Sequence, residues 1–306
     1  MAKKTKSGFV AIIGPTNAGK STLLNAIMGR KAAIVSHKVQ TTRTQLRAVK
    51  MVGDPSPQSG AEAGAQLIFV DTPGFFRPAR KLDRAMAKSA ADSLADADAV
   101  VLLIDAKHGI TETVGEIIKK LSGKNIFAAI NKVDEVKKES LLPLAQKLAD
   151  FGVFQEIFMI SALKNQGVGE MLDALAEVMP ESPYLFDPKD AVDVPDALWL
   201  AEITREKIYK FVHQELPYHI HVSTDKMETD GEGVVEVSQT IYVKTDGHKK
   251  IIIGAGGAQL KRIGTAARRE IQDEWGVNAR LRLFVRVEDW ENSAERYAEQ
   301  GLSYVK

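Results

Sequence analysis

The chain of 306 residues is 44% hydrophobic and 26% charged, the composition of a globular protein large enough for two domains. It contains no cysteine, which excludes disulfides, thiolate zinc sites and a cysteine nucleophile. The net charge is +1, no apolar run approaches the roughly 18 residues of a membrane span, and the basic start MAKKTKSG does not resemble a secretory signal. We therefore expect a cytoplasmic protein. We also expect a monomer.

The first 180 residues alternate apolar runs with helical patterns, which predicts a doubly wound α/β domain over 1–180. The runs lack the polar alternation of a half-exposed sheet, so helices are expected on both faces. The predicted strands are 9–14, 66–71, 99–105, 125–131 and 155–161, and the predicted helices are 20–28, 82–95, 111–122, 138–151 and 168–178. The Pro/Gly-rich stretch 53–65 is expected to be a mobile loop joining two antiparallel strands.

The stretch GPTNAGKS, residues 14–21, lies between a predicted strand and a predicted helix and matches the P-loop motif. Its glycines allow backbone N–H groups to turn towards phosphate oxygens, and the helix N-terminus adds positive potential. Lys20 is expected to reach the β- and γ-phosphates, and the Ser21 hydroxyl to bind Mg²⁺. The predicted phosphate-binding residues are Gly14, Asn17, Ala18, Gly19, Lys20, Ser21 and Thr22.

Two further stretches complete the predicted magnesium and γ-phosphate site. DTPG, residues 71–74, ends a strand, so that Asp71 is placed to hold Mg²⁺ through water and the Gly74 N–H to sense the γ-phosphate. In KVQTTRT, residues 38–44, Thr42 is preferred over Thr41 as a second metal ligand. Loss of the γ-phosphate would release both segments, which is a switch mechanism. The predicted metal ligands are Ser21, Thr42 and Asp71, and the predicted catalytic residues are Lys20, Thr42 and Gly74.

Phe75 and Phe76 follow DTPG, where a glutamine often orients the attacking water. Phenylalanine cannot orient water by hydrogen bonds, so slow intrinsic hydrolysis is expected, helped by another residue or by a partner. His37 and Arg77 are candidate helpers, although each also fits an ordinary surface position.

Two stretches at strand ends predict that the base is guanine. NKVD, residues 131–134, offers Asn131 to the N7/O6 edge of a purine, the stem of Lys132 to the base, and Asp134 to guanine N1–H and the 2-amino group. Adenine lacks both donors and would leave a buried carboxylate unpaired. In SAL, residues 161–163, the Ala162 N–H can contact guanine O6. The predicted guanine-binding residues are Asn131, Lys132, Asp134, Ser161, Ala162 and Leu163.

The pattern changes after residue 180. Residues 181–196 are proline-rich and predict an extended linker, and 197–306 predict a small α+β domain of order α-β-β-α-α-β. Its predicted elements are a helix at 197–216, strands at 219–228 and 233–244, a helix at 258–274 and a last strand over RLRLFVRVEDW. Residues 244–286 hold 10 basic against 4 acidic residues, a local basic stripe.

A second glycine loop, Gly254-Ala255-Gly256-Gly257, stands between basic residues. A G-x-x-G turn between two helices clamps the backbone of about four nucleotides in KH domains, because a Cβ would keep phosphate from the peptide groups. Alone, the turn could equally be a helix cap and the basic stripe a solvated helix face. The predicted RNA-binding residues are Lys249, Lys250, Ile253, Gly254, Ala255, Gly256, Gly257, Lys261, Arg262 and Arg268.

These stretches together resemble the Era family of bacterial ribosome-assembly GTPases, and the resemblance spans nearly the whole chain. It is carried by GPTNAGKSTLLNAIMGRK, QTTR, DTPG, NKVD, HQELPY (213–218) and IIIGAGGAQLKRIGTAAR (251–268). The resemblance implies a P-loop GTPase domain that binds GTP and GDP, and a type II KH domain that binds the 3′ end of 16S rRNA. It also implies late maturation of the small (30S) ribosomal subunit and peripheral association with the inner membrane.

In related GTPases the asparagine at the position of Asn17 is linked to a potassium ion, so K⁺ is a candidate cofactor beside Mg²⁺. The chain departs from the family pattern twice. The 53–65 loop looks longer than usual, and the clamp loop lacks the Lys or Arg that commonly fills one variable position.

The residues leave two classes of function open. One is a GTP-hydrolysing switch that gates RNA and ribosomal-subunit binding, which Thr42 and DTPG favour because both can sense a γ-phosphate. The other is a constitutive RNA-binding module in which the nucleotide is mainly structural. A membrane-signalling GTPase without RNA has little support beyond the basic N-terminus.

Overall fold

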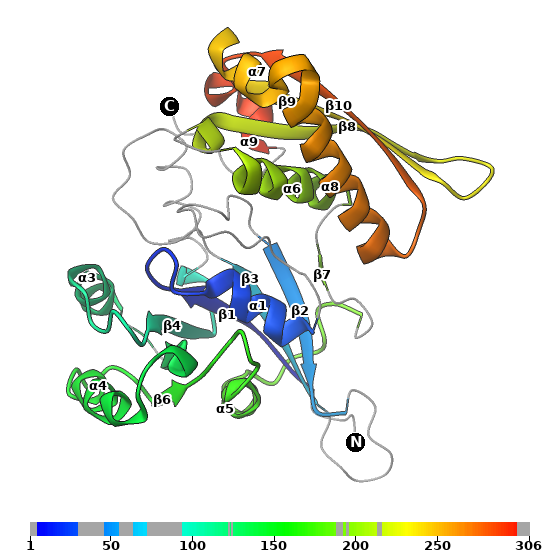
Figure 1. Ribbon diagram of the computed structural model, residues 1–306. Helices are drawn as coiled ribbons and strands as arrows, with labels where there is room; N and C mark the ends of the chain where they lie inside the picture. Colours follow the sequence, from blue (N-terminus) through cyan, green and yellow to red (C-terminus); the bar gives the residue numbers. More distant parts are fainter. Residues whose placement is uncertain are drawn as a thin grey trace. The chain divides into compact units, whose positions relative to one another are not determined.

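The computed structural model (Figure 1) describes residues 5–29, 46–54, 64–71, 94–121, 123, 125–187, 192–193, 196–212 and 216–298. The described residues fall into two compact units, one ending at residue 193 and the other beginning with a helix at residue 196. Each unit has its own sheet. Within these ranges, no helix has the length and apolar character that crossing a membrane requires.

The first unit is built on a seven-stranded sheet of order β6-β5-β4-β1-β3-β2-β7. β2 pairs antiparallel with β3 and β7, and the other pairs are parallel. The strands are β1 (Lys6–Ile13), β2 (Leu46–Val52), β3 (Ala65–Asp71), β4 (Ala99–Asp105), β5 (Ile126–Asn131), β6 (Glu156–Met159) and β7 (Val192–Asp193). The helices are α1 (Lys20–Met28), α3 (Glu112–Lys120), η1 (Val133–Glu135), η2 (Lys138–Ser140), α4 (Leu141–Ala149) and α5 (Val168–Val178).

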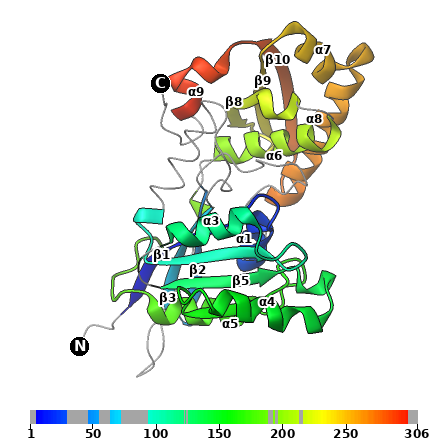
Figure 2. The ribbon, with the colours of Figure 1, turned by 90° about the vertical axis from the view of Figure 1, so that its left-hand side faces the viewer.

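Helices cover both faces of this sheet, as the unbroken apolar runs predict. Every residue of β4 and β5 is buried, which requires a layer on each side. α3 and α4 pack on one face, in a core with β1, β4 and β5, whereas α1 and α5 contact β2 and β3. Figure 1 shows α3 and α4 apart from α1 and α5, and Figure 2 shows strands of this sheet side by side. The doubly wound fold is therefore confirmed, and it gathers the carboxyl ends of β1, β3, β4 and β5 at one edge.

The predicted elements of this unit match the described ones closely. The helices predicted at 20–28 and 168–178 are found at those residues. The helix predicted over 138–151 divides into η2 and α4. The strands before and after 53–65 pair antiparallel as expected. Residues 55–63 and most of the helix predicted at 82–95 lie outside the described residues.

The described part of the stretch predicted as a linker contacts the first unit. Gln66 is fully buried, and its side-chain oxygen accepts hydrogen bonds from Leu185 N (2.8 Å) and Phe186 N (3.1 Å) while its nitrogen donates to Phe186 O (2.8 Å). The Tyr184 hydroxyl donates to Gly64 O at 2.8 Å. Farther on, β7 pairs with Arg47 and Ala48 of β2. The chain thus remains hydrogen-bonded to the sheet well beyond residue 180.

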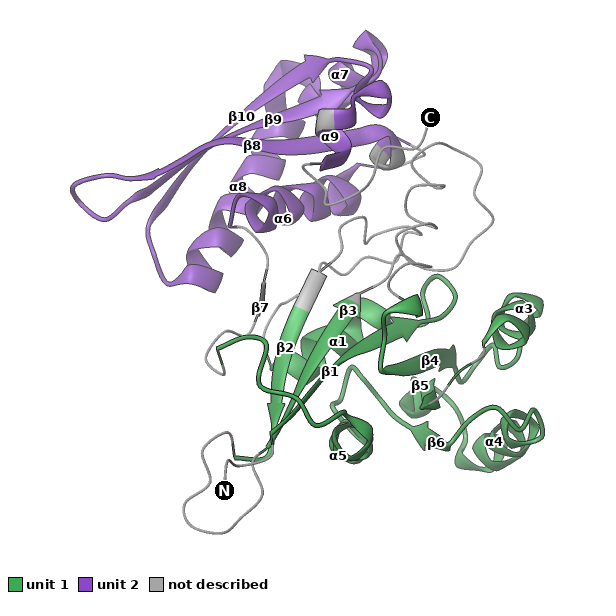
Figure 3. Ribbon diagram, turned by 180° about the vertical axis from the view of Figure 1, so that it is seen from behind, with its two compact units in different colours: residues 1–33, 42–193 green, residues 34–41, 194–306 purple. Residues whose placement is uncertain are grey.

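The second unit, shown in its own colour in Figure 3, has the order α-β-β-α-α-β, as predicted. Its sheet has the order β10-β9-β8, with β8 antiparallel and β10 parallel to β9. This is the expected type II arrangement, and its last described elements are two short helices. The elements are α6 (Asp196–Phe211), η3 (Leu216–His219), β8 (Ile220–Thr229), β9 (Val235–Val243), α7 (Asp246–Ile253), η4 (Ala255–Gly257), α8 (Ala258–Trp275), β10 (Ala279–Val287), η5 (Trp290–Asn292) and α9 (Ala294–Ala298).

The helical spacing of apolar residues in α8 sets which side of that helix faces the core. Ile263, Ala267 and Ile271 are fully buried, and Leu260 packs against the same core. Lys261, Arg262, Arg268 and Arg269 lie on the remaining surface of α8 and are exposed. The core therefore fixes α8 so that these cations face outward, with Lys261 and Arg262 in the part of the helix that follows the second glycine loop.

Gln66 offers a test of the contact between residues 184–186 and the sheet. Replacing it by leucine leaves Leu185 N and Phe186 N without their acceptor, so Gln66→Leu is expected to lower the free energy of unfolding by about 1–3 kcal/mol, measured by urea denaturation. The matched control is Gln146→Leu, since Gln146 is exposed on α4 and its side-chain nitrogen donates to Asp150 Oδ1 at 2.9 Å. Equal destabilisation by both variants would contradict the structural role of Gln66.

Candidate functional site

The P-loop is shaped by three residues with left-handed backbone between the end of β1 and the start of α1. Gly14, Asn17 and Gly19 have φ of 149°, 63° and 101°. A Cβ on Gly14 would collide with the carbonyl oxygen of Leu103, and one on Gly19 with the side-chain amide of Asn131. Both glycines are thus required by their own surroundings, and the loop they form places the N-terminal N–H groups of α1 at the carboxyl edge of the sheet.

Lys20 reaches back over this loop. Its side chain is buried, and Nζ donates hydrogen bonds to Gly14 O (3.0 Å) and Pro15 O (2.9 Å). The ammonium group is therefore held at the loop that is expected to surround the phosphates. Ser21 and Thr22 follow on the first turn of α1, where the motif places a metal ligand and a phosphate contact.

Asn131, at the end of β5, connects the P-loop to the SAL stretch. Its side chain is 2% exposed, donates from Nδ2 to Ala18 O (2.9 Å) and accepts at Oδ1 from Ala162 N (2.9 Å). An amide nitrogen carries two hydrogens, so the second is suited to an acceptor such as purine N7. One buried side chain thus brings three sequence-distant predicted stretches together.

Lys132 makes a second connection from the same stretch. Its backbone is left-handed, with φ 63°, and Nζ donates to Asn17 O at 2.8 Å and to Asp105 Oδ2 at 2.6 Å. Asp105 was not among the predicted site residues. The available signal was its position: the apolar run AVVLLID ends on an aspartate, next to the strand that ends in Asn131.

Asp134 lies beside the SAL stretch. A hydrogen bond from the Ser161 hydroxyl is the largest influence on its pKa and, with the nearby Lys164 ammonium 3.5 Å away, outweighs the opposing effect of burial and holds the pKa of Asp134 below its usual value. Ser161 is buried, whereas Leu163 is 78% exposed at the surface of this corner. A carboxylate kept ionised here can accept two hydrogen bonds from guanine.

The predicted γ-phosphate side of the site is described only in part. Asp71 ends β3 opposite Ile12 of β1, but its side chain lies outside the described residues. The same is true of all of Thr42 and Gly74. The candidate helpers His37 and Arg77, and the phenylalanines after DTPG, also fall outside.

The second glycine loop connects α7 to α8, as a G-x-x-G clamp requires. Gly254, Gly256 and Gly257 have φ of 72°, 57° and 80°. A Cβ on Gly254 would lie 2.7 Å from Gln259 Cβ and 3.0 Å from Gln259 N, whereas one on Gly257 would meet nothing within 4 Å. Gly254 is therefore needed for internal packing, while Gly256 and Gly257 are needed for their backbone conformation and leave open space in front of the loop.

Basic side chains surround this loop, but they are not equivalent. Lys250, Lys261 and Arg268 are exposed and Lys249 is half-buried. The guanidinium of Arg262 stacks on the ring of Phe211, with 4.3 Å from Cζ to the ring centroid. The remaining predicted residues are Ile253, which is half-buried at the end of α7, and Ala255, which is exposed.

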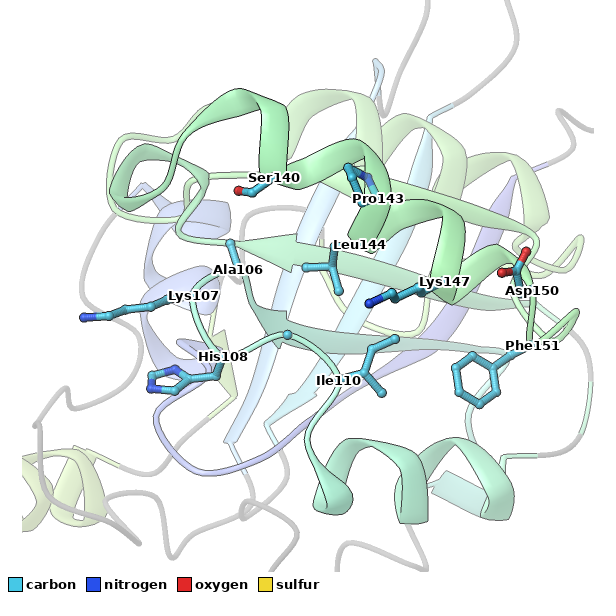
Figure 4. A pocket seen from close by; sticks show the side chains of 11 residues that line it. Ala106, Lys107, His108, Ile110, Ser140, Pro143, Leu144, Lys147, Asp150 and Phe151 are labelled. Atoms are coloured by element: carbon cyan, nitrogen blue, oxygen red, sulfur yellow. The ribbon is translucent and has the colours of Figure 1, made fainter.

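A pocket of 720 Å³ lies between α4 and the turn after β4 (Figure 4). Figure 4 shows Ile110, Leu144 and Phe151 on its apolar walls and Lys147 between them. None of the residues that line it is a predicted nucleotide-binding or RNA-binding residue. It does include residues 106–109 of the turn that begins at Asp105.

Comparisons with known proteins match both parts of the chain. A family model described as "50S ribosome-binding GTPase" matches residues 9–132, and a KH domain model matches residues 215–292. The GTPase Era of Rhizobium meliloti (strain 1021) is 45% identical over 309 residues, covering 100% of this chain and 95% of that protein. The GTPase Era of Afipia carboxidovorans is 46% identical over 308 residues, covering 100% of this chain and 97% of that protein.

Two solved structures are similar over almost the whole chain. One is an Aquifex aeolicus Era variant bound to GDP and AlF4⁻, and the other is an Era in complex with MgGDPNP and nucleotides 1506–1542 of 16S ribosomal RNA. Each has a TM-score of 0.88 and 34% identity, and covers 97% of this chain and 99% of its own.

The Ser161–Asp134 contact predicts how nucleotide affinity changes with pH. In the predicted guanine site ionised Asp134 is the acceptor, so nucleotide affinity is expected to be lost as pH falls through the pKa of this carboxyl group. Removing the Ser161 hydroxyl raises that pKa, so Ser161→Ala is expected to lose GDP affinity at a higher pH than the wild type, measured by calorimetric titration. Ser140→Ala is the matched control, because Ser140 Oγ donates only to Lys137 O, at 2.7 Å. Superimposable pH profiles for all three proteins would exclude this role of Ser161.

Proposed function

The chain belongs to the Era family of GTPases, and from this we propose that it is a GTP-hydrolysing switch that binds the 3′ region of 16S rRNA and assists late maturation of the small (30S) ribosomal subunit. One observation supports this most strongly: a P-loop joined to a guanine-selective corner and a G-x-x-G turn between basic helices occur in the same chain. The proposal divides the chain into a G domain at 1–180, a linker at 181–196 and a KH domain at 197–306.

In the proposed site the phosphates of GTP lie along the P-loop and the base lies at the Asn131–Asp134 corner. The Lys20 ammonium, now bonded to Gly14 O and Pro15 O, is close enough to turn to the β- and γ-phosphate oxygens. Asp134 accepts from guanine N1–H and the 2-amino group, and the Ala162 N–H can shift from Asn131 to O6. GDP would keep every base contact and lose only those to the γ-phosphate.

The oxygen donors in the site fit Mg²⁺. Ser21 lies on the first turn of α1, and Asp71 ends the strand next to β1; hydroxyl and carboxylate oxygens are ligands that this ion prefers. We assign Ser21, Thr42 and Asp71 to it. Bound Mg²⁺ would neutralise charge on the phosphates. Potassium near Asn17, cytoplasmic location, a monomeric state and inner-membrane association stay predictions.

Hydrolysis is proposed to be slow without a partner. Lys20 and the P-loop N–H groups stabilise the charge that develops when water attacks the γ-phosphorus. The segments around Thr42 and Gly74 must position that water, and no glutamine directly follows DTPG to help orient it. An intrinsically slow hydrolysis step keeps the GTP-bound state long enough for RNA to be bound or released.

RNA is proposed to lie along the second glycine loop. The open space in front of Gly256 and Gly257 lets phosphates approach their peptide groups. Because Ala255 and Gly256 carry no charge, the salt-dependent part of binding must come from lysines and arginines on α7 and α8. Bases would be read beside Ile253.

The switch proposal is tested by measuring RNA affinity with a GTP analogue, with GDP and without nucleotide. A switch requires GTP and GDP to have different effects on RNA affinity, and we expect the two affinities to differ about fivefold or more. The RNA probe is a 16S 3′-terminal oligonucleotide, with binding followed by fluorescence anisotropy. Equal affinities in the three states would favour a constitutive RNA-binding module with a structural nucleotide.

A second test separates the two glycine loops. Gly254→Asp is expected to abolish RNA binding while GTP affinity stays unchanged, because Gly254 has no room for a Cβ beside Gln259. Gly276→Asp is the matched control. Gly276 has a similar φ of 65° and caps the far end of α8, and a Cβ added there would meet no atom within 4 Å. Loss of GTP affinity in Gly254→Asp would show a general folding defect instead.

A third test locates the RNA by its salt dependence. Changing Lys249, Lys250, Lys261 and Arg262 to glutamine is expected to reduce the slope of log K against log salt by about 3, since each single-stranded phosphate contact contributes roughly 0.7. The control is the same change at Lys119, Lys120, Lys137 and Lys138, exposed lysines of the first unit. An unchanged slope in the first variant would place the RNA on another surface.

A further inference from the structure

We propose that Asp105 is a positioning residue for guanine nucleotide binding, which holds the ammonium group of Lys132 so that the lysine stem is fixed beside the base. The proposal rests on the assignment of Asn131–Asp134 to guanine. It concerns a residue outside the recognised motif stretches.

Asp105 is placed for this by the strand pairing. It is the last residue of β4 and lies opposite Asn131, the last residue of β5, in the parallel register. Its side chain is only 9% exposed. A carboxylate in this position points from the end of one strand towards the residue that follows the next strand, which is Lys132.

The two oxygens of Asp105 have different partners. Oδ1 accepts from the backbone N–H of Lys107 at 2.8 Å, which orients the carboxylate plane, and Oδ2 accepts from Lys132 Nζ at 2.6 Å. The imidazole of His108 lies 3.2 Å from Oδ2 but is 66% exposed. Lys132 is therefore the principal partner of the second oxygen. Burial alone would raise the pKa of Asp105, but the hydrogen bonds from Lys132 and Lys107 outweigh it and hold the pKa below its usual value.

Lys132 depends on this contact for its conformation. Its four-carbon stem has many rotamers in water, but here Nζ is attached at Asp105 and at Asn17 O of the P-loop. The side chain is 28% exposed, which leaves part of the stem free to cover a base. Without Asp105, one neutral carbonyl would remain to hold the cation, and both the stem and the P-loop residue Asn17 would be less well ordered.

Asp105 also has a local role that the test must separate. Its backbone oxygen accepts from Gly109 N at 2.8 Å, and together with Oδ1 it forms the turn that lines the pocket in Figure 4. If Asp105 served only this turn, its loss would affect folding equally whether or not Lys132 were present.

The test is a double-mutant cycle on the full chain with GDP as the probe. Asp105→Asn keeps the shape of the side chain and an acceptor for Lys107 N but removes the charge, and Lys132→Met keeps an apolar stem but removes the ammonium. We expect Asp105→Asn to raise the dissociation rate of GDP about tenfold or more in the wild type and to have no further effect in Lys132→Met. Equal effects in both backgrounds would overturn the proposal.

Two controls keep the result specific. Asp98→Asn changes a part-buried aspartate just before the other end of β4, which accepts from Phe9 N at 2.8 Å, and should leave GDP dissociation unchanged. Asp105→Glu retains the charge and should bind GDP more tightly than Asp105→Asn; weaker or equal binding overturns the proposal. The guanine site itself is tested by Asp134→Asn. If the wild type binds GDP and this variant does not, the guanine site is correctly assigned. A double-mutant cycle without coupling would then contradict only the role of Asp105.

Discussion

The loops at the carboxyl edge of the first sheet are joined by the side chain of Asn131. A parallel sheet brings the ends of β1, β4 and β5 to one edge but does not fix the loops that follow them. Asn131 does so by using one buried amide to bond Ala18 O in the P-loop and Ala162 N in the SAL stretch. Because neither partner can be satisfied by water at a site 2% exposed, the three stretches are fixed together.

The two glycine loops meet different constraints although both suit phosphate. Around Gly14 and Gly19 the protein itself occupies the space that a side chain would need, so the first loop lies directly against β4 and the side chain of Asn131. Around Gly256 and Gly257 the space is open, so the second loop can lie against a chain that continues in both directions.

The sequence predicted the central strands of both sheets and the helices that follow the two glycine loops, because these depend on local pattern, but it did not predict β7. It did not predict Asp105 or Gln66, because their partners come from distant parts of the chain. Gln66 stands in the apolar run AQLIFVD, where a polar residue in a buried strand needs a partner that periodicity cannot identify. Asp105 likewise looks like a turn residue until the register of β4 and β5 places it beside Lys132.

The proline-rich stretch was predicted from its composition to be an extended linker, but its described residues form hydrogen bonds with the first unit. Four prolines in residues 180–195 favour an extended chain, and an extended chain has backbone groups free to pair with an edge strand or a buried polar side chain. Gln66 forms hydrogen bonds with three such groups of residues 185–186, and β2 pairs with Val192–Asp193. β2 is also the first described element after the predicted Thr42 segment. A movement of β2 would therefore directly change its backbone pairing with residues 192–193, because no side chain mediates that contact.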